Sequence, residues 1–93
     1  MNVVAIPSFR KIIKKLHPNQ KKVLDEAVRK ICENPNLGEQ KVGDLAEVYV
    51  YKFKVSAQLM LLAYKVDIQE ATLTLLHLAP HENFYRDLKT KNH

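Results

Sequence analysis

Four side chains in the second half of the sequence have the chemistry of an acid–base site: Lys52, Lys54, His81 and Tyr85. The two lysines are two residues apart in an alternating segment, so on a strand they would share one side, roughly 7 Å apart. His81 follows the last apolar segment, and histidine can act as a general acid or base near neutral pH. Tyr85 can stack on a base, donate a proton or pack on the sheet. Taken singly, each also has a plain structural interpretation: surface lysines that aid solubility, a histidine that caps a loop and a tyrosine that packs.

The familiar motifs for metals and cofactors are absent from the sequence. The two glycines, Gly38 and Gly43, form no phosphate-binding loop, and there is no nucleophile elbow. His77 and His81 are four residues apart, but Pro80 lies between them, so they cannot share the helix face that an i, i+4 metal pair uses. We therefore expect neither a metal nor a cofactor.

The first half of the chain has the pattern of a strand followed by two helices. Residues 2–6 are mostly apolar and β-branched and stop at Pro7, which predicts a strand, with Ser8 as the N-cap of the next helix. His17-Pro18 breaks this helix and opens another, which residues 34–38 end. The apolar residues at helical spacing are Phe9, Ile12, Ile13 and Leu16 in the first helix and Leu24, Ala27, Val28 and Ile31 in the second.

The second half changes to the period-two pattern of strands. Residues 48–55 alternate, with Lys52 and Lys54 opposite the aromatic residues, and residues 59–66 and 71–79 are further apolar segments. The short connections between them predict hairpins and hence an antiparallel meander, and residues 81–89 are expected to add a short C-terminal helix. The fold class is therefore α+β in the order β-α-α-β-β-β. Two N-terminal helices pack on one face of the sheet, and the lysines, including Lys65 by parity, lie on the other.

Length and charge point to one small domain with an anionic partner. We expect residues 1–93 to form a single domain, with residues 90–93 as a loose tail. The net charge is +5, and residues 10–22 hold six basic residues and no acidic one. Such a surface favours nucleic acid or an acidic protein as the partner, without choosing between them.

The remaining composition indicates a cytoplasmic protein. The single cysteine, Cys32, can form no internal disulfide and favours a reducing compartment. Pro7 ends the first apolar run too early for a secretory signal. The longest uninterrupted apolar stretch, residues 59–64, is far shorter than the roughly 20 residues of a membrane span, so we expect no membrane partner.

Three segments together carry a family resemblance. They are Tyr51-Lys52-Phe53-Lys54-Val55 with the strand ending Leu61-Leu62-Ala63-Tyr64, the strand Thr74–Leu78 that leads into Ala79-Pro80-His81-Glu82-Asn83-Phe84-Tyr85, and the connector Asn34-Pro35…Gly38…Lys41-Val42-Gly43-Asp44-Leu45. In order and spacing they resemble the RelE/ParE family of bacterial toxins, over the whole chain. The resemblance implies the toxin of a type II toxin–antitoxin pair, with a cognate antitoxin as partner.

For the RelE branch, the resemblance implies a metal-independent endonuclease that cleaves mRNA on the ribosome. A ribose 2′-hydroxyl attacks the adjacent phosphate, which requires a base, cations for the developing charge and an acid for the leaving 5′-oxygen. By position, Lys52 and Lys54 match strand lysines in the base and charge-stabilising roles. His81 stands where the YafQ-like branch has a catalytic histidine, and Tyr85 near an aromatic residue that stacks on the base or assists the chemistry. The candidate substrate-binding residues are Lys41, Lys65, Phe84 and Arg86.

One position departs from the RelE pattern. Leu61 stands where RelE places an arginine, and Lys65, Lys41 and His77 are the candidates to supply the missing charge.

Two interpretations other than an endonuclease stay open. The ParE branch shares the fold, lacks the ribonuclease residues and inhibits DNA gyrase by binding it. The third interpretation is a noncatalytic module that holds RNA or an acidic partner on the basic residues 10–22.

Overall fold

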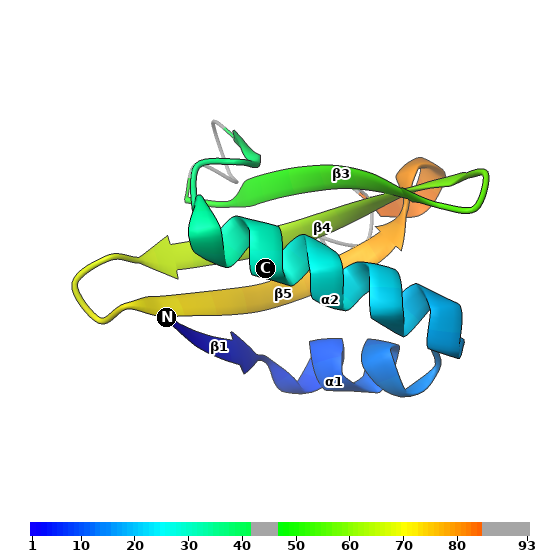
Figure 1. Ribbon diagram of the computed structural model, residues 1–93, viewed down its shortest axis with the longest axis horizontal. Coiled ribbons are helices and arrows are strands. Elements are labelled where there is room, and N and C mark those ends of the chain that lie inside the picture. The colour runs from blue at the N-terminus through cyan, green and yellow to red at the C-terminus, as the bar shows by residue number, and fades with distance from the viewer. Residues whose placement is uncertain (42–46, 85–93) are drawn as a thin grey trace.

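The computed structural model describes residues 1–41 and 47–84, which form a mixed sheet with two helices across one face (Figure 1). The elements are β1 (Asn2–Ala5), α1 (Pro7–Lys14), α2 (Pro18–Glu33), β2 (Glu39–Gln40), β3 (Tyr49–Val55), β4 (Gln58–Asp67) and β5 (Thr72–Pro80), and residues 81–84 make a final helical turn. The α+β class is thereby confirmed. Tyr85, Arg86, the rest of the expected C-terminal helix, the tail and residues 42–46 of the connector lie outside the described residues.

The strand order in the sheet is β1-β5-β4-β3-β2. As expected, β3, β4 and β5 form an antiparallel meander. The sequence pattern did not indicate how the two edges are built. β1 pairs parallel with β5, and β2, only two residues long, pairs antiparallel with β3.

Proline sets the start of both helices. α1 begins at Pro7 with Ile6 as its N-cap, so the prediction of Ser8 as the cap is wrong, because Ser8 already lies in the first turn. α2 begins at Pro18, and the Gln20 side chain accepts a hydrogen bond from the His17 N–H at 2.8 Å, which fixes the turn between the helices. Within residues 1–41 and 47–84, no helix has the length and apolar character needed to span a membrane.

Each face of the sheet packs against a different part of the chain. The helices cover the larger core, on the face that carries Leu62, Tyr64 and Leu73. On the opposite face, Phe84 from the final helical turn packs over a smaller cluster, which we call the second core. Its other buried members are Val48, Val50, Leu61, Ala63 and Ala79. The second face is therefore partly covered by the segment that follows β5.

Tyr64 fastens the loop after α2 to the middle of the sheet. Its hydroxyl donates to the Pro35 carbonyl and accepts from the Gly38 N–H, both at 2.9 Å. A Cβ at Gly38 would come within 2.6 Å of the Tyr64 hydroxyl oxygen, so the close approach requires glycine. Burial raises the pKa of Tyr64 above its ordinary value; the Gly38 hydrogen bond opposes the shift, and the nearby Tyr49 adds to it.

Candidate functional site

Lys52 and Lys54 lie on the second face of the sheet, the face away from the helices. Both side chains are exposed. Across the β3–β4 ladder, Lys52 pairs with Leu61 and Lys54 with Leu59. Paired residues point to the same side of an antiparallel sheet, and Leu61 belongs to the second core. The two lysines therefore stand beside that core, as strand parity predicted.

The end of β5 brings His81 to the same region. Leu61 pairs with Lys52 on one side and with Ala79 on the other, so Lys52 and Ala79 end a row that crosses three strands. Cα atoms two strands apart are roughly 10 Å from each other. His81 follows two residues after Ala79, at the start of the helical turn, with an exposed side chain. The four-carbon stem of each lysine is long enough to span part of this separation, over Leu61 for Lys52 and over Leu59 for Lys54.

This arrangement is a shared surface and not a hydrogen-bonded cluster. In the described part of the chain, no hydrogen bond or ion pair holds the side chain of Lys52, Lys54 or His81. What the surface offers is two cations and one imidazole that are free to engage an anion from solution. Cations stabilise charge that develops on a phosphate, and an imidazole can protonate a leaving oxygen.

Leu61 and Phe84 form the buried base of this surface. Both side chains have 0% exposure in the second core. The Phe84 ring also lies with its centroid 5.6 Å from that of His77. Phe84 is a candidate substrate-binding residue by sequence, but its buried ring offers no exposed surface to a nucleotide. Its packing in the second core instead fixes the helical turn that begins at His81 against the sheet.

The residues considered as substitutes for the missing arginine lie at other points of the second face. Lys65 is four residues from Leu61 along β4, roughly 13 Å away, and is exposed. The Lys41 ammonium pairs with Glu39 at 3.3 Å, and the Lys41 N–H donates to the Val48 carbonyl at 2.9 Å. His77 is nearer, since it pairs with Ala63, but it is buried with 4% exposure.

A match to a family model decides where the fold belongs. The model of the ParE-like toxins of type II bacterial toxin–antitoxin systems matches residues 3–89. The chain belongs to this family. The resemblance to the RelE/ParE toxins is thereby confirmed, and with it the toxin class.

Solved structures of E. coli RelE share the fold of this toxin. In the intact E. coli RelBE toxin–antitoxin complex, the matching chain has a TM-score of 0.70 at 17% identity, over 84% of this chain and 93% of that chain. An E. coli RelE mutant bound to a peptide of the antitoxin RelB has a TM-score of 0.70 at 17% identity, over 92% of this chain and 90% of that chain. Isolated E. coli RelE has a TM-score of 0.70 at 16% identity, over 97% of this chain and 96% of that chain. At these identities the likeness concerns the fold alone. No curated protein sequence matches the toxin.

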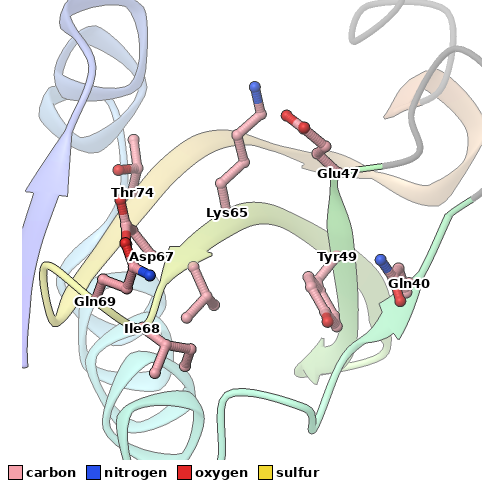
Figure 2. Close-up of a pocket in the computed structure, with 9 residues that line it drawn as sticks. Gln40, Glu47, Tyr49, Lys65, Asp67, Ile68, Gln69 and Thr74 are labelled. Atoms are coloured by element: carbon pink, nitrogen blue, oxygen red, sulfur yellow. The ribbon is translucent and has the colours of Figure 1, made fainter.

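A hollow of about 540 Å³ lies at the far end of the toxin's sheet, beside the β4–β5 turn (Figure 2). Lys65, a candidate substrate-binding residue, lines it together with Tyr49 and the strongly exposed Ile68. Glu47 and Asp67 bring two carboxylates to the same hollow. This mixed charge makes the hollow a poor match for an anion, so it does not extend the surface of Lys52, Lys54 and His81.

The six basic residues between positions 10 and 22, namely Arg10, Lys11, Lys14, Lys15, Lys21 and Lys22, are all exposed. They give the toxin a cationic surface on α1, the α1–α2 turn and the first turns of α2. Among the described residues, no three His, Cys, Asp or Glu side chains gather as ligands for a metal ion.

The residues around the α1–α2 turn were not among the predicted site residues. His17, Gln20 and Gln58 line hollows next to the end of β5. No sequence signal joined them, because the α1–α2 turn and the β3–β4 turn are about 40 residues apart in the chain.

Proposed function

We propose that this toxin inhibits translation by cutting mRNA in the ribosome, with the surface of Lys52, Lys54 and His81 as its active site. One observation carries the proposal: register places both exposed lysines on the same face as the end of β5, where the exposed His81 begins the helical turn. Phosphodiester cleavage without a metal requires a base, a cation and an acid, and two lysines with one histidine can supply all three.

In this mechanism the ribose 2′-oxygen attacks the adjacent phosphorus while the bond from phosphorus to the 5′-oxygen breaks. The products are a 2′,3′-cyclic phosphate and a free 5′-hydroxyl. One lysine, as the neutral amine, accepts the 2′-hydroxyl proton, and the other, as the ammonium cation, stabilises the charge on the pentacoordinate phosphorus. His81, as the protonated imidazole, donates its proton to the leaving 5′-oxygen. Tyr85 would stack on a neighbouring base. Lys41, Lys65 and Arg86 would contact the RNA away from the reacting phosphate, and Phe84 would hold the turn of His81 in place.

A second candidate function is inhibition of DNA gyrase by direct binding. Two observations favour it: the matching family model is that of ParE-like toxins, and Leu61 is completely buried at the position where RelE carries an arginine. In that case the same lysines would serve only as part of a protein-binding surface.

Expression of the toxin in a heterologous bacterium separates the two functions. An mRNA endonuclease leaves transcripts whose 5′ ends map to defined codon positions by primer extension, and His81→Ala abolishes them. A gyrase inhibitor leaves broken DNA and an SOS response, and His81→Ala is as toxic as the wild type. Lys30→Ala removes an exposed lysine from the second half of α2, on the helix side of the sheet, and is the control for general loss of charge.

A further inference from the structure

Two adjoining hollows form one groove at the end of the molecule nearest His81. Their volumes are about 630 Å³ and 390 Å³, and His17, Gln20 and Gln58 line both. The groove lies where the α1–α2 turn, the β3–β4 turn and the final helical turn come together, and Figure 1 shows all three at the same end of the sheet. We call it the hairpin groove.

The hairpin groove begins where the candidate active site ends. Leu59 lines it, and Leu59 is the cross-strand partner of Lys54. Glu82 lines it as well, directly after His81. A chain held between Lys54 and His81 can therefore continue into the groove without crossing the covered part of the second face.

The lining has the character of a site for a flat, polar-edged group. Its floor is apolar and comes from α1, the α1–α2 turn and the strands, namely from Ile12, Leu16, Val55, Leu59, Met60, Leu78 and Pro80. Its polar groups are the His17 imidazole, the amides of Asn19, Gln20 and Gln58, and Ser56. An imidazole and an apolar floor can stack a nucleobase, and amides can read its edge.

The charge around the groove favours a polyanion. Lys15 lines the groove, and Lys54 stands at its other margin as the partner of Leu59. Glu82 is the one carboxylate among the residues that line these two hollows. Arg10, Lys11 and Lys14 lie on α1 before Lys15, so a strand that leaves the groove meets further cations.

We propose, on the basis of the proposed RNA-cleaving function, that the hairpin groove binds an unstacked nucleotide of single-stranded RNA next to the cleaved phosphate. The nucleobase lies over the apolar floor of the groove beside His17, with its edge against Gln58. Lys15 neutralises a phosphate of the same RNA strand. The Gln20 carbonyl oxygen already accepts from the His17 N–H, and Asn19 lines only the larger of the two hollows. Gln58, which lines both, is therefore the amide best placed to select the nucleobase.

Binding of fluorescein-labelled, short homopolymeric single-stranded RNAs, followed by fluorescence anisotropy, tests this. Full-length toxin with His81→Ala serves as the background, so the RNA stays intact. We expect Gln58→Ala to weaken binding by ~5- to 10-fold, and unequally for the four bases, because one base-edge contact is lost. The matched control is Gln69→Ala, an exposed glutamine in the β4–β5 turn, which leaves the affinity unchanged.

The charge contact has its own measurement. Lys15→Gln should reduce the slope of log K against log salt by about 0.7, the value for one phosphate contact with a single strand. Lys30→Gln, on the second half of α2, should leave the slope as it is. Photo-crosslinking with 4-thiouridine RNA should map to peptides that contain residues 15–20 and 55–60.

Three results would overturn the proposal. They are equal affinities for Gln58→Ala and Gln69→Ala, crosslinks confined to other peptides, and weakened binding of an acidic antitoxin segment with RNA binding unchanged. These outcomes are independent of the proposed activity. If the wild type cut no mRNA while Gln58→Ala still lost RNA affinity, the groove would stand as an RNA site and the endonuclease function would fall.

Discussion

Lys52 and Leu61 are cross-strand partners in the β3–β4 ladder, one exposed to solvent and the other completely buried. Beyond Leu61 in the same row lies Ala79, two residues before His81. The candidate active site is therefore built around an apolar residue that Phe84 covers. This relationship sets what substitutions at the centre of the surface can do.

Leu61→Arg should destabilise the toxin by about 2–4 kcal/mol, because it places an unpaired charge in the second core beside Lys52. Urea unfolding monitored by circular dichroism measures the loss. Leu61→Met is the volume-conserving control and should cost less than about 1.5 kcal/mol. Full stability of the arginine variant would show that the second core opens easily.

Phe84→Ala should cost about 3 kcal/mol of unfolding free energy, since it empties a fully buried site. Phe84→Leu should recover much of that loss. If Phe84 positions His81, toxicity should follow the order wild type, leucine variant, alanine variant. Full toxicity of the alanine variant at a temperature where it stays folded would show that the turn needs no such anchor.

Tyr64→Phe should destabilise the toxin by about 1–3 kcal/mol, because the buried Gly38 N–H and the part-buried Pro35 carbonyl each lose their partner. Tyr51→Phe is the matched control, because Tyr51 lies in β3 on the same face of the sheet as Tyr64. Its hydroxyl has no hydrogen bond within residues 1–41 and 47–84, so this variant should change stability by under about 0.5 kcal/mol. Equal effects of the two variants would exclude the fastening role of Tyr64.

Because the pKa of Tyr64 is raised, the unfolding free energy of the toxin depends on pH in the alkaline range. The folded state holds the phenol proton more tightly than the unfolded state. This contribution is fully present below the unfolded-state pKa near 10.0 and is lost as pH rises through the folded-state pKa. The difference in unfolding free energy between wild type and Tyr64→Phe should thus be constant from pH 7 to 9 and shrink above about pH 10. A difference that grows with pH would contradict the burial of the phenol.

Periodicity was enough to predict most of the fold. The helix faces around Phe9 and Leu24 and the alternation through Lys52 and Lys54 depend on residues a few positions apart, so the sequence displays them directly. The parallel pairing of β1 with β5 depends on residues 70 positions apart, such as Asn2 and Thr72, and has no local signal. β2 has only Glu39 and Gln40, too few residues for any pattern.

The candidate site was predictable in part. Strand parity placed Lys52, Lys54 and Lys65 on one face, because alternation is a local property of the backbone. The burial of Phe84 was not predictable, since it depends on the chain folding back over the second face after β5. The error at Ser8 is also physical: Pro7 has no N–H to lose and is tolerated at the first helical position, so the helix starts one residue before the polar cap candidate.

The most direct test of the central claim is primer extension on transcripts from cells that express the toxin, its His81→Ala variant or its Lys52→Ala variant. Both side chains are exposed, so each variant should keep its unfolding free energy within about 0.5 kcal/mol of the wild type. We expect cleaved transcripts with the wild type, and cleavage reduced ~100-fold or more with His81→Ala, the usual cost of removing a general acid. Uncut transcripts, broken DNA and equal toxicity of the wild type and both variants would contradict the account and leave gyrase inhibition in its place.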